Sequence, residues 1–138
     1  MLSTRILIID HHQDFLNAVV KMLKRDFTIV GALPDGGCGL AFALALNPDI
    51  IILDISLPDI DGIEVAKRLA AAECRAKIIF LSDHENPDLV AATLDLGASG
   101  YVFKSRMISD LMTAIDVALR DAVFMPTPTP PSKSKAAA

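Results

Sequence analysis

The sequence predicts one α/β domain in which helices cover both faces of a parallel sheet. Five short apolar runs recur along the chain, and most of them lack the polar alternation of a strand that has one face in water. The stretches between them carry apolar residues at helical spacing, so that strand and helix alternate five times. With 138 residues, 52% of them hydrophobic, the chain is long enough for one ordinary globular core.

The five apolar runs are the predicted strands. They are RILII (5–9), TIVGAL (28–33), IIIL (50–53), KIIFL (77–81) and GYVF (100–103). The first, third and fourth runs are the most uniformly aliphatic, so we expect them in the centre of the sheet, whereas the second and fifth contain Thr, Gly or Tyr and suit its edges. This placement favours strand order 2-1-3-4-5, the order of a flavodoxin-like (βα)5 three-layer sandwich.

Apolar stripes and terminal signals predict the helices. The first helix has a stripe of Phe15, Leu16, Val19 and Leu23, and the last has one of Ile108, Leu111, Met112, Ile115 and Leu119. For the fourth, Asn86 before Pro87 is typical of a helix start, and Gly97 is typical of a helix end.

The composition changes after Phe124, where the chain reads MPTPTPPSKSKAAA. A proline-rich segment with Ser and Lys cannot bury a core, so we expect a domain over residues 1–124 and a linker or tail over 125–138. Any output domain would then be absent from this chain.

Charge and apolar run length exclude several classes of protein. The formal net charge of −4 lacks the basic surplus of a nucleic-acid binder. No apolar run approaches the ~20 residues of a membrane-spanning helix. Cys38 and Cys74 have no CxxC or metal-ligand spacing and are interpreted as small buried apolar residues in a reducing compartment. We therefore expect a cytoplasmic protein that binds neither nucleic acid nor membrane through this domain.

Polar residues follow four of the predicted strands at the point where each strand ends. They are Asp10, Asp54, Ser82 and Lys104. Open α/β sheets bind ligands at the carboxyl ends of their strands, so two carboxylates, a hydroxyl and an ammonium are expected to meet in one cleft. Taken singly, Asp54 could cap a helix, Ser82 could be a turn residue and Lys104 could be a solvated edge charge.

The chain resembles the receiver domain of a two-component response regulator, from about Ile6 to Leu119. The matching pieces are ILIID, IIILDISLPDIDGIE, IIFLSDH and GASGYVFKS. The DHH start, and the FKS ending without a following proline, are similar to the NarL/FixJ-like subfamily.

This resemblance implies that Asp54 is the phosphoacceptor of a sensor histidine kinase. It also implies a Mg²⁺ ion held by Asp10, Asp54 and the backbone carbonyl of Ser56, with Lys104 and Ser82 on the phosphoryl oxygens. The chemistry agrees, because the charges of a carboxylate and a phosphoryl group must be offset by cations in a shaped site.

The same resemblance pairs Ser82 with Tyr101 as a switch, in which the aromatic moves inward as the hydroxyl is drawn to the phosphate. The alternative for Tyr101 is a half-exposed aromatic on an edge strand. Partners, including a second copy, would meet the first and fifth helices, or the face of the fourth helix, fifth strand and fifth helix.

His11 stands where most receivers carry a second acid, and this departure puts metal binding in question. Mg²⁺ prefers oxygen, whereas imidazole suits Zn²⁺, Cu²⁺ or Ni²⁺. Three alternatives remain open: the ring turns away and leaves a weakened Mg²⁺ site, it is protonated and partly replaces the metal's charge, or phosphorylation has been lost. His12 is interpreted as an exposed helix start. Asp59 and Asp61 are interpreted as solvated turn residues.

The sequence therefore predicts a phosphorylatable receiver in two-component signal transduction, connected with transcription regulation. We expect no enzyme activity beyond its own phosphorylation and dephosphorylation. The alternative is a pseudo-receiver that acts as an interaction or dimerisation module regardless of phosphate. A dinucleotide-binding protein is disfavoured, because no GxGxxG follows the first strand. An aspartyl-nucleophile phosphatase would want a second acid where Ser56 stands.

Overall fold

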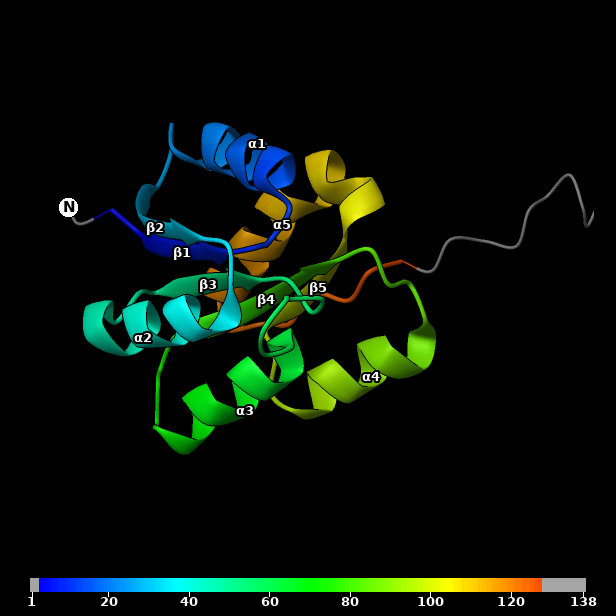
Figure 1. Ribbon diagram of the computed structural model, residues 1–138. Helices are drawn as coiled ribbons and strands as arrows, with labels where there is room; N and C mark the ends of the chain where they lie inside the picture. The colour runs from blue at the N-terminus through cyan, green and yellow to red at the C-terminus, as the bar shows by residue number, and fades with distance from the viewer. Residues whose placement is uncertain (1–2, 128–138) are drawn as a thin grey trace, which may run out of the picture.

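The computed structural model describes residues 3–127 and shows one sheet between two layers of helices. All pairings in the sheet are parallel, and the strand order is β2-β1-β3-β4-β5, which confirms the predicted fold. Figure 1 shows α1 and α5 on one face of the sheet, with α2, α3 and α4 on the other. Each face has its own apolar cluster.

The central strands are the ones that the sequence placed there. The strands are β1 (Arg5–Ile9), β2 (Thr28–Leu33), β3 (Ile50–Leu53), β4 (Lys77–Ser82) and β5 (Gly100–Phe103). Every residue of β3 is buried, because helices cover it on both faces and neighbours pair with it on both edges. The edge strand β2 has no fully buried residue.

Five helices connect and follow the strands. They are α1 (Gln13–Leu23), α2 (Gly36–Leu46), α3 (Gly62–Ala71), α4 (Pro87–Asp95) and α5 (Met107–Leu119), with a short 3₁₀ turn η1 (Lys104–Arg106) before α5. The fourth begins as predicted: the Asn86 side chain accepts a hydrogen bond from the amide of Asp88 at 2.8 Å. Gly97, at φ +95°, lies just beyond its end.

The buried face of α5 differs from the predicted stripe at both ends. Ile108 is 83% exposed and Leu119 is 41% exposed. The face that packs on the sheet consists of Met107, Leu111, Ala114, Ile115 and Ala118. Two alanines stand on this face, where small side chains let a helix pack closely. The face of α5 that is buried is therefore rotated about the helix axis relative to the predicted stripe of large apolar residues. Cys38 is also exposed and Cys74 half-buried, so the expectation that both are buried was wrong.

Asp59 is an exposed turn residue, as expected, but it also has partners that the sequence did not indicate. Although its side chain is exposed, its two carboxylate oxygens accept hydrogen bonds from the amides of Gly36 and Gly37, each with an N···O distance of 2.8 Å. These amides belong to the first turn of α2, where carboxylates are favourable. The same two hydrogen bonds lower the pKa of Asp59. Asp61 caps α3 through the amide of Glu64 at 2.9 Å.

Within residues 3–127, no helix has the length and apolar content needed to cross a membrane. The described chain continues past α5 to residue 127, and Phe124 forms an isolated parallel bridge with Gly100 of β5. The domain boundary after residue 124 remains a prediction, and most of the predicted tail, residues 128–138, lies outside the described part of the chain.

Candidate phosphoacceptor site

The register of the sheet brings Asp10 and Asp54 to the same level. Ile9 of β1 pairs with Leu53 of β3, so the residues that follow them lie side by side at the carboxyl edge. The amide of Asp54 also donates to the carbonyl of Ile9 at 2.9 Å, which extends this pairing by one residue. Both carboxylates are buried, each with about 2% of its residue surface exposed. Two ionised carboxylates buried side by side repel each other, and a cation in contact with both relieves this repulsion.

Lys104 supplies that cation. It follows the last residue of β5, and its Nζ lies 2.9 Å from Oδ2 of Asp10 and 3.2 Å from Oδ2 of Asp54. The same ammonium lies 4.6 Å from the centre of the Phe15 ring, which closes the site from the α1 side. The interpretation of Lys104 as a solvated edge charge is therefore wrong.

The charges of this group shift the pKa values of its members. Burial raises the pKa of Asp54, and the neighbouring charge of Asp10 raises it further, while Lys104 lowers it. Burial acts to lower the pKa of Lys104, but the hydrogen bond and charge of Asp10 together with the charge of Asp54 outweigh it and leave that pKa raised. Lys104 is therefore held as an ammonium, and it favours the ionised form of Asp54.

His11 does not turn away from the site, so the first of its three predicted alternatives was wrong in its geometry. Its Nδ1 lies 3.5 Å from Oδ2 of Asp54, with the side chain 34% exposed. This nitrogen is buried and has no hydrogen-bond partner among the described residues. Together with Asp10, His12 and Asp54, it offers nitrogen and oxygen atoms that all lie within 4.8 Å of one another. A buried nitrogen without a partner beside two carboxylates fits a divalent cation.

His12 is exposed and directly precedes α1, as expected, but its ring also reaches the site. Its amide donates to Oδ1 of Asp10 at 2.9 Å, which fixes that carboxylate. Its Nδ1 lies 3.3 Å from Nζ of Lys104. An ammonium only donates hydrogen bonds, so Nδ1 of His12 accepts in this contact.

Ser82 and Tyr101 converge on the backbone of His84. The amide of His84 donates to Oγ of Ser82 at 3.0 Å, and the Tyr101 hydroxyl donates to the carbonyl of His84 at 2.7 Å. Ser82 and Tyr101 are both fully buried, so Tyr101 is not a half-exposed edge aromatic. Burial raises the pKa of Tyr101, which keeps its hydroxyl a donor.

The His84 ring links this pair back to the phosphoacceptor candidate. Its Nε2 lies 2.8 Å from Oγ of Ser56, and the amide of Ser56 donates to Oδ1 of Asp54 at 3.1 Å. The role predicted for the Ser56 carbonyl remains a prediction. His84 was not among the site residues predicted from the sequence. Its place two residues after Ser82, the polar end of the central strand β4, could have indicated it.

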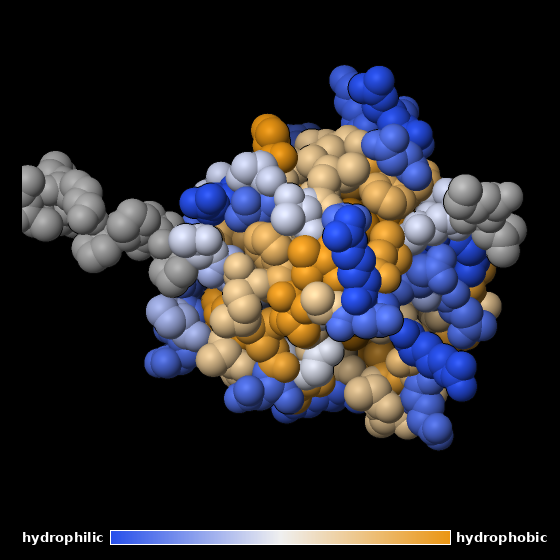
Figure 2. All heavy atoms as spheres, turned by 180° about the vertical axis from the view of Figure 1, so that it is seen from behind, coloured by the Kyte–Doolittle hydropathy of each residue, from blue (hydrophilic) through white to orange (hydrophobic). Residues whose placement is uncertain are grey.

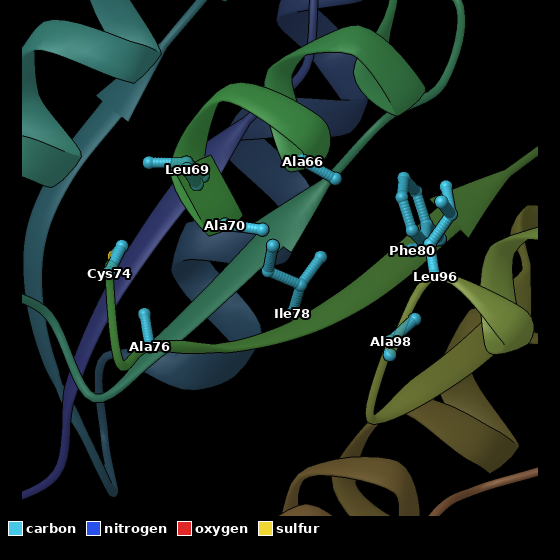
Figure 3. Close-up of a pocket in the computed structure, with 10 residues that line it drawn as sticks. Ala66, Leu69, Ala70, Cys74, Ala76, Ile78, Phe80, Leu96 and Ala98 are labelled. Atoms are coloured by element: carbon cyan, nitrogen blue, oxygen red, sulfur yellow. The ribbon is translucent and has the colours of Figure 1, made fainter. Parts of the chain in front are cut away.

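A separate apolar pocket lies away from these groups. It has a volume of about 110 Å³, and Figure 3 shows side chains of α3 and of β4 facing it. Ala66, Leu69, Ala70, Cys74, Ala76, Ile78, Phe80, Leu96, Gly97 and Ala98 line it. This lining carries no carboxylate, imidazole or cation.

Comparisons with known proteins identify the family of this chain. The family model for the response regulator receiver domain matches residues 6–116. A putative transcriptional regulator of Pseudomonas aeruginosa is 35% identical over 90% of this chain, and the nitrate/nitrite response regulator protein NarL of Escherichia coli K12 is 31% identical over 80% of it. The chain spans 60% and 52% of the lengths of these two relatives.

Solved structures show the same likeness. A two-component response regulator of the LuxR family from Aurantimonas superimposes with a TM-score of 0.84 at 26% identity, covering 90% of each chain. The signal receiver domain of the putative response regulator NarL from Mycobacterium tuberculosis gives 0.77 at 28% identity, covering 88% of this chain and 97% of that one.

Proposed function

Because this chain belongs to the receiver domains of response regulators of the LuxR/NarL type, we propose that it accepts a phosphoryl group on Asp54. The observation that carries the proposal is the convergence of two buried carboxylates on one buried ammonium at the carboxyl edge of the sheet. Asp54 is the acceptor in this proposal because it directly follows the central strand β3 and is contacted by Lys104, by the amide of Ser56 and by the ring of His11.

The reaction forms one bond and breaks another. A carboxylate oxygen of Asp54 attacks the phosphorus of a phosphohistidine or small acyl phosphate, an O–P bond forms, and the donor's P–N or P–O bond breaks with its electron pair leaving on the donor. The ammonium of Lys104 offsets the negative charge on the transferring oxygens. The hydroxyl of Ser82, which now accepts from the amide of His84, is available as a donor to the phosphoryl group. Water returns the mixed anhydride to Asp54 and inorganic phosphate.

The residues present fit a divalent cation, and Mg²⁺ is the proposed one. Asp10, Asp54 and the Ser56 carbonyl would hold it, with Nδ1 of His11 directed at the same place. When bound, such a cation supplies a second positive charge next to the phosphoryl oxygens. Because imidazole is a poor ligand for Mg²⁺, His11 supports weaker Mg²⁺ binding than a carboxylate at this position would give.

A sensor histidine kinase is the proposed phosphodonor, and the cytoplasm the proposed compartment. Through an output domain outside this chain, the protein would act in transcription regulation. We propose no enzyme activity beyond the chain's own phosphorylation and dephosphorylation. Figure 2 shows hydrophobic residues gathered in the middle of the rear face, with hydrophilic residues around and across them, which supports contact with another protein, including a second copy.

A phosphate-affinity gel with a small acyl-phosphate donor tests the proposal. The chain is expected to give a shifted band in the presence of Mg²⁺, and intact mass should show one added phosphoryl group. Asp54→Asn should abolish both signals, whereas Asp59→Asn, an exposed carboxylate on the same loop, should keep them. Labelling that persists in Asp54→Asn would place the acceptor elsewhere. No labelling of the wild type would favour the pseudo-receiver alternative.

A further inference from the structure

The segment after α5 folds back onto the outer edge of β5. Asp121, at φ +62°, lies in the turn that ends the helix, and its carboxylate lies 2.6 Å from Nζ of Lys77. Further on, the amide of Phe124 donates to the carbonyl of Ser99 at 2.9 Å, and its carbonyl accepts the amide of Tyr101 at 3.2 Å. An edge strand otherwise presents unpaired backbone groups, and here the chain's own segment pairs with them. We name residues 123–126 the strap.

The strap also forms one wall of a cleft beside α4. Met125 and Pro126 line a cleft of about 140 Å³ whose other walls are Glu85, Pro87, Val90, Ala91 and Phe103. Pro126 is buried there, and Phe124 packs against the apolar cluster beneath α1 and α5. The strap is therefore held by backbone hydrogen bonds at Phe124 and by the burial of Pro126, whereas Met125 is 61% exposed.

Gly100 permits this close approach. A Cβ at position 100 would lie 3.1 Å from Cβ of Phe124, which is tighter than ordinary van der Waals contact. The side of β5 that faces the strap is thus shaped to receive it.

One loop joins the strap to the phosphoacceptor site. The loop runs from Ser82, the last residue of β4, to Pro87, the first residue of α4. At its start, the carbonyl of His84 accepts a hydrogen bond from the Tyr101 hydroxyl, and the ring of His84 contacts Ser56 near Asp54. Glu85 and Pro87 belong to its end and form a wall of the cleft that holds the strap. Tyr101 itself donates its amide to the strap. A rearrangement of this loop at the site therefore reaches the strap through the cleft wall and through β5.

From this arrangement we propose that the surface formed by β5 and α4 is an internal docking surface whose occupant is the strap, and that phosphorylation of Asp54 releases it. The proposal rests on the proposed phosphorylation. When the Ser82 hydroxyl is drawn toward a phosphoryl group, it no longer accepts the hydrogen bond from the His84 amide. The loop that positions Tyr101 and the wall of the cleft is then held less tightly. Binding free energies are reciprocal, so release of the strap in turn favours the phosphorylated arrangement.

Backbone amide exchange measured by NMR on the full chain tests the release. Phosphoryl occupancy is followed by intact mass after treatment with a small acyl-phosphate donor and Mg²⁺. In the phosphorylated protein, the amides of Phe124 and Tyr101 should exchange about tenfold faster, while that of Thr28, hydrogen-bonded at the opposite edge of the sheet, stays unchanged. Phosphorylated protein with unchanged exchange at Phe124 overturns the inference and leaves the proposed function intact. If treatment adds no phosphoryl mass, the proposed function is wrong, and release of the strap loses its trigger.

A second comparison needs no phosphate and decides whether the loop holds the strap. Tyr101→Phe removes the hydroxyl that binds the His84 carbonyl, and Pro126→Ser removes a buried apolar side chain that lines the cleft. Each variant should speed exchange at the Phe124 amide about tenfold. Leu44→Ser is the matched control, because the Leu44 side chain is 45% exposed on α2, away from the cleft. In this variant the Phe124 amide should exchange at the wild-type rate. Wild-type exchange in both test variants would overturn the coupling.

Discussion

The ammonium of Lys104 lies 3.2 Å from Oδ2 of Asp54, although 50 residues separate the two in the chain. Their side chains are only 5% and 2% exposed, so this contact is made away from bulk water. A buried charge without its partner is strongly unfavourable, so the contact positions both groups as well as tuning their charge.

Lys104→Gln should slow phosphorylation of Asp54 by about 10²–10³-fold, because it removes the fixed charge that offsets the transferring oxygens. The measurement is the rate of mass increase with a small acyl-phosphate donor. Lys67→Gln, an exposed lysine on α3, should retain the wild-type rate. A Lys104→Gln rate within about twofold of wild type would contradict the role of this ammonium.

The carboxyl group of Asp54 should titrate at a higher pH than an ordinary aspartate in the metal-free protein. Burial, together with the charge of Asp10, raises the pKa of Asp54. The midpoint of its titration, followed by NMR of the carboxyl carbon, should therefore lie above the ordinary value of 3.8, and in Lys104→Gln it should move higher still, since Lys104 lowers this pKa. A midpoint that falls in Lys104→Gln would refute this assignment.

His11→Asp should bind Mg²⁺ about tenfold more tightly, since it replaces a nitrogen directed at Asp54 with the oxygen that Mg²⁺ prefers. The affinity of the same variant for Zn²⁺ relative to Mg²⁺ should fall. Isothermal titration calorimetry measures both constants. His12→Asp adds the same charge at a side chain that is 52% exposed and should have the smaller effect. Equal Mg²⁺ affinities of the wild type and His11→Asp would show that His11 does not limit the site.

Gly62→Ala should lower the free energy of unfolding by about 2–4 kcal/mol. A Cβ there would lie 2.8 Å from Cα of Ile55 and would also meet the carbonyl of Asp54, and neither backbone atom can give way without moving the site. In Gly37→Ala the nearest atom is a carboxylate oxygen of Asp59 at 3.0 Å, so the loss should stay below about 1 kcal/mol. Urea unfolding of the two variants gives the comparison, and equal losses would argue against the steric account.

Asp59→Asn should lower the melting temperature by about 2–4 °C near neutral pH, because it weakens the two hydrogen bonds to the start of α2. The folded pKa of Asp59 is lowered, so its stabilisation is present above the unfolded pKa and is lost as pH falls through the folded one. The difference between wild type and variant should therefore shrink in acid. Thermal scans across pH measure it, with the exposed Asp95→Asn as the control. A difference that grows in acid would mean that the carboxylate is not the stabilising form.

Much of the fold and the centre of the site followed from local patterns. Uninterrupted aliphatic runs are typical of strands covered on both faces, and this identified β1, β3 and β4 as central. Because all strands of a parallel sheet end at one edge, the polar residues at their ends were expected to meet, and Asp10, Asp54 and Lys104 do so.

Other features depended on which way a side chain or segment turned. The sequence could not show that the ring of His11 faces Asp54, that Asp59 reaches the start of α2, or that His84 joins Ser56 to Tyr101. Each contact joins a loop residue to a group whose position is set by another element. The spacing of apolar residues predicts helices and strands, but it does not predict the path of the loops between them.

The layered α/β architecture and the residue types at the carboxyl edge of the sheet can be predicted from short segments, because burial on two faces and strand polarity are properties of such segments. How those groups contact one another, and that the chain beyond α5 returns to pair with β5, depends on the packing of the whole domain. A parallel bridge between positions 100 and 124 arises when a helix has packed and reversed the chain, so it belongs to the folded domain and not to either segment alone.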